Sequence, residues 1–160
     1  MNVKTDAQSH LRQPLTDDLV LELWSRTYNT KGKPDWSHIF PYYHDDIVFE
    51  DCIQKVEGKN AFMAMCNRLT KRCEQLQIDI SSVAHRPPVI FMEWKMTMIF
   101  RKTPSTPIFG CTKLTLGEDG RILHQRDYYD LSCIHRGQPP SAAPAPGGLR
   151  ALVPGLLCLV

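Results

Sequence analysis

Hydrophobic side chains recur at helical spacing in three segments of the first half of the chain, which predicts three helices. The first helix follows Thr16, a residue type that caps helices, and two acidic residues occupy its first turn. A second, short helix is expected over residues 36–43, where Pro41 should kink it or end it early. Asn60 is expected to cap the third helix, whose apolar stripe is narrow.

Alternating apolar and polar residues mark the strands. In "DDIVFEDC", within a strand expected over residues 46–53, Ile47 and Phe49 share one face, and the same parity places Asp51 after them. After residue 76 the pattern changes to long segments in which apolar and polar residues alternate: "LQIDISSVAH", "VIFMEWKMTMIFRK", "PIFGCTKLTL" and "RILHQRDYYDL". Helices followed by a run of antiparallel strands predict an α+β fold with the helices on one face of a curved sheet.

The length of 160 residues fits one folded domain, which we expect over residues 14–132. Residues 1–13 are polar and are expected to be mobile. Residues 133–160 form a Pro/Ala/Gly-rich tail that is expected to be disordered, because its composition cannot bury a core.

The tail ends in the apolar stretch "LRALVPGLLCLV", which is too short to span a bilayer. It could dock on the domain, bind a partner or be a sticky end. Because no Asp or Glu follows Asp130, the tail also resembles a read in a shifted frame. Sequencing the coding DNA across this region would decide between a native tail and a shifted frame.

The composition and the spacing of charged residues, histidines and cysteines argue against several classes of function. The net charge of +2 and the lack of Lys/Arg clusters interleaved with aromatic residues argue against nucleic acid and acidic membranes as partners. The histidines show no HExxH motif and no pairing with cysteine at ligand spacing, so we expect no metal and no cofactor. Six cysteines without CxxC spacing, and no secretory signal, predict reduced thiols in a cytoplasmic protein.

Asp51 raises the question of chemistry, because a carboxylate on an apolar face is costly unless it has a partner or a purpose. It could be a strand-end residue that accepts backbone hydrogen bonds, or it could lie in a pocket. Alternation on the long strand also brings Trp94, Met96 and Met98 to one face, where they form either core or pocket wall. Asp127 could equally be a fold residue paired with Arg126 or with a helix terminus.

The order of elements, with "YYHDDIVFEDCI", "VEG" and "GRILHQRDYYDL", resembles the SnoaL-like branch of the nuclear-transport-factor-2-like superfamily over residues 16–131. This superfamily includes ketosteroid isomerase, limonene-1,2-epoxide hydrolase and SnoaL polyketide cyclases. The resemblance implies a cone-like fold, in which a strongly curved mixed or antiparallel sheet wraps around the helices and encloses a pocket. Family habit also implies a homodimer through the outer face of the sheet.

The resemblance assigns roles to two carboxylates. Asp51 matches the proton-abstracting Asp of ketosteroid isomerase, and Asp127 matches a water-activating Asp of limonene-epoxide hydrolase. The chain departs from both families elsewhere. Thr112 falls near the protonated Asp of the isomerase, and Met96 and Met98 fall near the Arg and Asp of the hydrolase.

Together these observations predict an apolar pocket for a small hydrophobic ligand that carries oxygen. The expected catalytic residues are Asp51 and Asp127. The expected ligand-binding residues are Tyr28, Tyr43, Phe49, Trp94, Met96, Met98, Thr112 and Tyr129. Three functions remain open: a SnoaL-like isomerase, cyclase or hydrolase, a non-catalytic ligand-binding module, and a structural dimerisation domain.

Overall fold

The computed structural model describes residues 13–100, 103–104 and 107–129. The residues predicted to form a mobile N-terminus, apart from Gln13, and the predicted tail 133–160 lie outside the described residues. The elements follow the chain in the order α1 (Asp17–Tyr28), η2 (Phe40–Tyr42), β1 (Tyr43–Glu50), β2 (Lys55–Glu57), α2 (Lys59–Arg72), β3 (Gln75–Arg86), β4 (Val89–Phe100), β5 (Thr103–Pro104), β6 (Ile108–Leu116) and β7 (Ile122–Tyr129).

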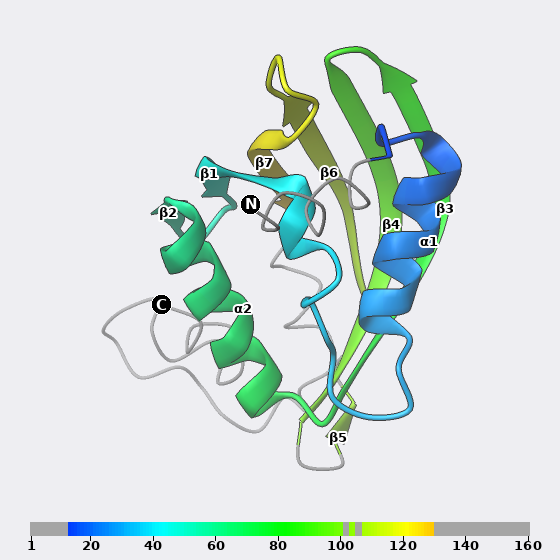
Figure 1. Cartoon of the computed structure of the whole chain (residues 1–160). Helices are drawn as coiled ribbons and strands as arrows, with labels where there is room; N and C mark the ends of the chain where they lie inside the picture. Colours follow the sequence, from blue (N-terminus) through cyan, green and yellow to red (C-terminus); the bar gives the residue numbers. More distant parts are fainter. Residues whose placement is uncertain (1–12, 101–102, 105–106, 130–160) are drawn as a thin grey trace, which may run out of the picture.

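One curved sheet forms the body of the molecule (Figure 1). Its strand order is β2-β1-β7-β6-β4-β3, with β5 paired to β4. The β1–β7 pair is parallel and the other pairs are antiparallel, so the sheet is mixed. The described sheet is open, because its edge strands β2 and β3 do not pair with each other. The predicted α+β fold with a strongly curved sheet is confirmed.

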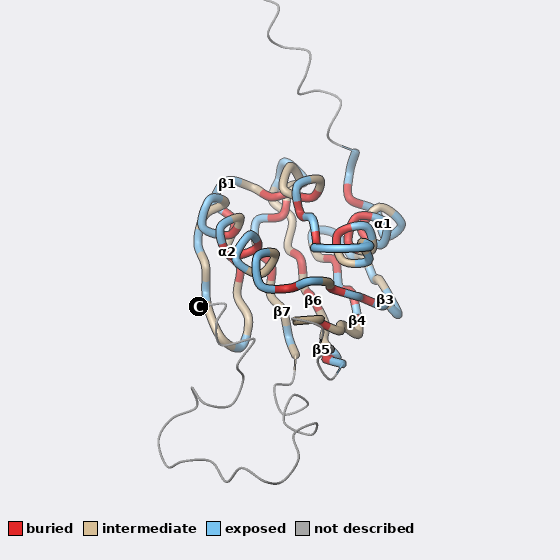
Figure 2. Tube along the Cα trace, turned by 90° about the horizontal axis from the view of Figure 1, so that it is seen from below, coloured by how far each residue is buried: buried red, intermediate tan, exposed pale blue. Residues whose placement is uncertain are grey.

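Both α-helices cover the same, concave face of this sheet (Figures 1 and 2). Helix α1 packs against β3 at one end of the sheet, and α2 packs against β1 and β2 at the other. Thr16 caps α1 as predicted, since its hydroxyl accepts a hydrogen bond from the backbone N–H of Leu19 at 3.3 Å. Helix α2 begins earlier than predicted, with Gly58 at φ 86° in the N-cap position in place of Asn60.

The predicted helix over residues 36–43 is wrong. The segment contains turns and the single 3-10 turn η2, and β1 already begins at Tyr43. The apolar spacing that suggested a helix arises because Trp36 and Ile39 are core residues, 5% and 1% exposed. Pro41 has no N–H to donate to the carbonyl four residues before it, so a regular α-helix cannot continue through this position.

The core lies between the helices and the inner face of the sheet. Ile47 and Phe49 are 0% and 5% exposed, which confirms the parity predicted for this strand. On α1, the buried residues include Val20, Leu23 and Trp24. No helix among the described residues is long and apolar enough to cross a membrane.

Candidate functional site

A cavity of about 90 Å³ lies between the two helices and the inner face of the sheet. It is mostly apolar and takes its walls from α1, α2 and strands β1, β4, β6 and β7. The lining residues are Tyr28, Trp36, Tyr43, Phe49, Asp51, Gln54, Phe62, Met65, Cys66, Leu69, Trp94, Met96, Met98, Ile108, Gln125, Asp127 and Tyr129.

Asp127 is the central polar group of this cavity. It lies on the inner face of β7, directly opposite Thr112 of β6, whose hydroxyl donates to Oδ1 at 2.7 Å. The side-chain amide of Gln125 donates to both carboxylate oxygens, at 3.1 and 3.3 Å. Burial raises the pKa of Asp127 to about 6, because these hydrogen bonds offset only part of the lost solvation. Asp127 can therefore take up or release a proton near neutral pH.

Two hydrogen-bond chains converge on Asp127. In the first, the indole N–H of Trp94 donates to Thr112 at 2.9 Å, and Thr112 donates onward to the carboxylate. In the second, the hydroxyl of Tyr43 donates to Oε1 of Gln125 at 2.6 Å, and the amide of Gln125 donates to the carboxylate. Because each donor is itself buried or packed, the orientation of the Asp127 carboxylate is well defined.

Asp51 lies immediately after β1, at the strand end and beside the cavity. Its Oδ1 accepts backbone hydrogen bonds from Ile53 and Gln54, at 2.7 and 2.8 Å, as a strand-end Asp would. Its Oδ2 accepts the hydroxyl of Tyr129 at 3.0 Å, and the residue lines the cavity. Asp51 is thus held in one orientation by the backbone while it faces the pocket.

The parallel pairing of β1 with β7 is what brings the two carboxylates to one site. Glu50 pairs with Arg126 in the register, so the residues that follow them, Asp51 just after β1 and Asp127 within β7, lie beside each other on the inner face. The negative charge of Asp51 adds to burial in raising the pKa of Asp127.

Seven of the eight predicted ligand-binding residues line the cavity. Trp94 and Met98 do so while also belonging to the core, at 4% and 3% exposed. Thr112 is different, because it is not among the lining residues. It is buried in β6, where it accepts a hydrogen bond from Trp94 and donates one to Asp127. Its position makes Thr112 a positioning residue for the carboxylate.

One wall of the cavity was not predicted from the sequence. Phe62, Met65, Cys66 and Leu69 of α2 contribute side chains to it, and Trp36 contributes another from the turn before η2. Their helical spacing indicated an apolar stripe, yet that signal is the same for a core and for a pocket wall. Only the gap between α2 and the sheet distinguishes the two.

The other titratable groups in the cavity are neutral donors at ordinary pH. Burial raises the pKa of the Tyr43 and Tyr129 hydroxyls and of the Cys66 thiol. The raised thiol pKa makes Cys66 a poor nucleophile despite its position in the wall. This leaves the carboxylates as the groups that can act as acid or base.

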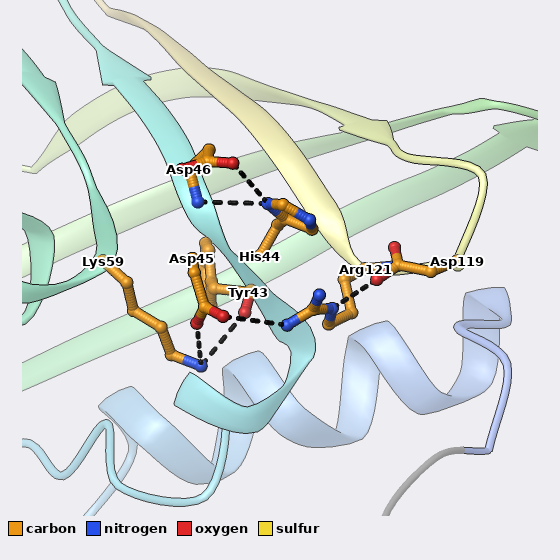
Figure 3. A network of polar contacts seen from close by, with 7 residues as sticks. All are labelled: Tyr43, His44, Asp45, Asp46, Lys59, Asp119 and Arg121. Carbon is orange, nitrogen blue, oxygen red and sulfur yellow. Dashed lines mark hydrogen bonds and ion pairs between the residues drawn. The ribbon is translucent and has the colours of Figure 1, made fainter.

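An ion-pair network supports the cavity from the side of β1 (Figure 3). The ammonium of Lys59, in the first turn of α2, donates to the backbone carbonyl of Tyr43 at 3.1 Å and lies 3.8 Å from Asp45. The guanidinium of Arg121 lies 3.7 Å from Asp45 and pairs with Asp119 in the β6–β7 turn. The network joins β1, α2 and β7 at the point where the β1–β7 register shifts, and so fixes the backbone of Tyr43.

In the part of the chain that the structure describes, no group of three or more His, Cys, Asp or Glu side chains is placed to hold a metal ion. Of the cysteines in the described ranges, Cys52, Cys66, Cys73 and Cys111 are free thiols.

Residues 22–125, more than half of the chain, match the family model described as SnoaL-like domain. The chain belongs to the SnoaL-like domain family. The match begins within α1, covers α2 and most of the sheet, and ends at Gln125, two residues before Asp127. No curated protein matches this SnoaL-like chain.

Three solved structures with the same fold are similar to this chain. A hypothetical protein with a ketosteroid isomerase-like fold from Catenulispora acidiphila, in complex with trimethylamine, aligns with a TM-score of 0.64 and 16% identity, over 81% of this chain and 100% of the other. An LEH-like epoxide hydrolase from M. tuberculosis aligns with a TM-score of 0.56 and 19% identity, over 62% and 74%. A putative SnoaL-like polyketide cyclase from Shewanella denitrificans gives 0.56 and 20%, over 65% and 87%. At these identities the similarity establishes the fold of the SnoaL-like chain.

Proposed function

We propose that this SnoaL-like domain binds a small, largely apolar molecule that carries oxygen, and that Asp127 exchanges a proton with it. The observation that carries the proposal is a carboxyl in an apolar cavity whose pKa is raised to about 6. A group that titrates near the working pH serves equally well as acid and base. The reaction class would be isomerisation, cyclisation or hydrolysis, all of which need a proton to be transferred.

Asp51 supplies the second carboxylate of this mechanism. Its Oδ1 is held by two backbone N–H groups and its Oδ2 by Tyr129, so its charge stays at a defined place beside Asp127. When two carboxylates share one apolar site, their pKa values move apart, so one can act as acid and the other as base. In the proposed reaction Asp51 acts as general base, and Asp127 is the second acid or base.

A non-catalytic binding module is the second candidate, because the chain departs from both mechanistic families at matched positions. Met96 and Met98 stand where the resemblance to the hydrolase expects Arg and Asp, and both line the cavity. In a binding module the same carboxylates would orient a ligand and would not turn it over.

The first experiment is a carbon-13 NMR pH titration of the Asp carboxyls, with Asp51→Asn and Asp127→Asn for assignment. We expect the Asp127 signal to titrate near pH 6 and to move to lower pH in Asp51→Asn, because a neighbouring negative charge is removed. An Asp127 signal that titrates near about 3.9 and ignores Asp51 contradicts the acid–base proposal.

Turnover of small epoxides and unsaturated ketones then separates the two candidates. For an enzyme, Asp51→Asn and Asp127→Asn should each lower kcat by about 100-fold or more with the fold intact. For a binding module, they should change affinity alone.

We also propose that the protein forms a homodimer, and the residues that support this proposal lie on the outer face of the sheet. Phe91, Phe109 and Tyr128, from β4, β6 and β7, are 43%, 61% and 47% exposed. Lys113 lies over the Phe91 ring and Arg126 over the Tyr128 ring, at 6.0 and 5.3 Å from the ring centroids. Aromatic residues with Arg are typical of interfaces, and a face that mixes them can pair with its own copy about a two-fold axis.

We propose a cytoplasmic location for the same protein. The free thiols of the described cysteines, which include the exposed Cys52, support a reducing compartment.

A further inference from the structure

The charge inside the cavity is unbalanced. Among the described residues that line it, Asp51 and Asp127 are the carboxylates, and none is Lys, Arg or His. Arg68 of α2, whose charge acts on Cys66, does not line the cavity. Carboxylates that are removed from water without a counter-charge are costly, and a bound cation would offset that cost.

Five side-chain hydrogen-bond donors in and around the cavity are already directed at acceptors of the protein itself. Trp94 donates to Thr112, Thr112 donates to Asp127, and Tyr129 donates to Asp51. The amide of Gln125 donates to Asp127, and the hydroxyl of Tyr43 donates to Gln125. An anionic ligand would have to take these donors away from carboxylates that would then repel it. The arrangement therefore disfavours ligands that carry a carboxylate or phosphate group.

The aromatic walls suit a cation whose charged atom carries alkyl substituents. Seven aromatic rings line the cavity: Tyr28, Trp36, Tyr43, Phe49, Phe62, Trp94 and Tyr129. Several of them pack against one another, as the Tyr43 and Phe62 rings do at 4.6 Å between centroids and the Trp94 and Tyr129 rings at 6.3 Å. Ring faces attract cations, most strongly when the cation is desolvated, and aromatic cages recognise methylated ammonium groups.

The volume limits the size of the group that enters. An engineered protein cavity of about 150 Å³ accommodates benzene, so about 90 Å³ suits a head group of a few heavy atoms. A compact, tetrahedral alkylammonium group meets this limit better than an extended chain or a fused ring system.

We propose that the cavity binds a small organic cation, a tertiary or quaternary alkylammonium group, with Asp51 and Asp127 as counter-charges and the aromatic rings as its cage. This inference rests on the proposed function, because it names the class of molecule that the same cavity takes. The ligand then carries a cationic nitrogen in addition to its oxygen.

The protonation of Asp127 should govern the affinity for such a cation. The titratable groups in electrostatic contact with Asp127 are Tyr28 of α1, Tyr43 of β1, Asp51 and Cys52 after β1, Cys66 of α2 and Cys111 of β6. Of these, Asp51 is the group whose charge raises the pKa of Asp127. Binding should therefore strengthen as pH rises through about 6, where Asp127 loses its proton.

Tetramethylammonium and tert-butanol form a matched pair of probes, since both are compact and tetrahedral and they differ in charge. Their dissociation constants would be measured by NMR titration of the cavity side chains at pH 8 and pH 5, at constant chloride concentration. We expect tetramethylammonium to bind at least about tenfold more tightly than tert-butanol at pH 8, which corresponds to a cation–π and counter-charge contribution of about 1.4 kcal/mol. This preference should shrink at pH 5 and in Asp127→Asn, and it should be unchanged in the surface control Glu118→Gln.

The outcomes separate the inference from the proposed function. If tert-butanol binds as tightly as tetramethylammonium and both move cavity signals, the cavity takes small molecules and the cation inference is overturned. If neither probe moves a cavity signal, both the inference and the small-molecule function are overturned. If the preference survives in the double variant Asp51→Asn/Asp127→Asn, the carboxylates are not the counter-charges and the inference is also overturned.

Discussion

At the scale of single residues, Asp127 shows how an ordinary carboxyl becomes a proton-exchanging group. Its neighbours Thr112 and Gln125 donate hydrogen bonds that favour the charged form, while burial and the charge of Asp51 disfavour it. Burial has the larger effect, so the pKa rises to about 6. The same balance links the chemistry of the site to the stability of the fold.

Asp127 should make the protein less stable as pH rises from about 4 to 6. The folded carboxyl, with its pKa near 6, still holds a proton at pH values where the unfolded carboxyl, with its pKa of 3.8, has released it. The folded state thus binds more protons in this window, and the free energy of unfolding falls by up to about 1.4 kcal/mol per pH unit before it levels off above pH 6.

Urea unfolding of the wild type and of Asp127→Asn between pH 4 and pH 8 measures this effect. The difference between their free energies of unfolding should decline up to pH 6 and stay constant above it. The control is Glu118→Gln, in the exposed β6–β7 turn, which should show no such decline. A flat difference for Asp127→Asn would mean that the carboxyl is solvated in the folded protein.

At the scale of elements, the pairing of β4 with β6 positions the indole of Trp94. Trp94 lies directly opposite Gly110, and its ring extends across the space where a side chain would otherwise be. A Cβ at position 110 would meet Cη2 of Trp94, Cζ2 of the same ring at 2.5 Å and the backbone carbonyl of Tyr128 at 2.8 Å. The glycine therefore allows Trp94 to reach Thr112 and to support Asp127.

Gly110→Ala should destabilise the protein by about 1–3 kcal/mol, because the methyl group overpacks against a ring and a backbone atom. It should also displace the indole N–H of Trp94 from Thr112, which NMR would detect as a shift of that indole signal. The matched control is Gly32→Ala, in a loop where a Cβ would meet no atom within 4 Å. Equal stability of the two variants would show that Trp94 can repack freely.

At the scale of the whole molecule, the curved sheet divides two roles between its faces. The concave face carries the helices and the cavity (Figures 1 and 2). The outer face carries the exposed rings of Phe91, Phe109 and Tyr128 with the cations that lie over two of them. Exposed aromatic residues gathered on one face are more typical of an interface than of a solvated surface.

Phe109→Lys should therefore convert a dimer into a monomer. Light scattering coupled to size exclusion should give about twice the chain mass of 18.3 kDa for the wild type and about that mass for the variant. Leu21→Lys, on α1 and 41% exposed, replaces an apolar residue away from the outer face and should leave the dimer intact. A monomeric wild type would contradict the proposed interface.

Much of the fold could be predicted because its determinants are local. The N-cap at Thr16, the parity of Ile47 and Phe49 and the long alternating strands follow from spacing alone, and tertiary structure has little freedom to alter them. The helix predicted around Pro41 was wrong because buried residues in a turn can have the spacing of a helix. Short apolar runs are ambiguous when the core lies on only one side of them.

The sequence by itself determined the α+β class, the SnoaL-like motifs and the presence of carboxylates at Asp51 and Asp127. Tertiary structure decided that these carboxylates lie beside each other, through the parallel pairing of β1 with β7. It also decided that Thr112, which does not line the cavity, donates a hydrogen bond to Asp127, and that α2 forms one wall of the cavity. The physical reason is that strand register and the gap between a helix and a sheet depend on packing between segments far apart in the chain, where no local periodicity records them.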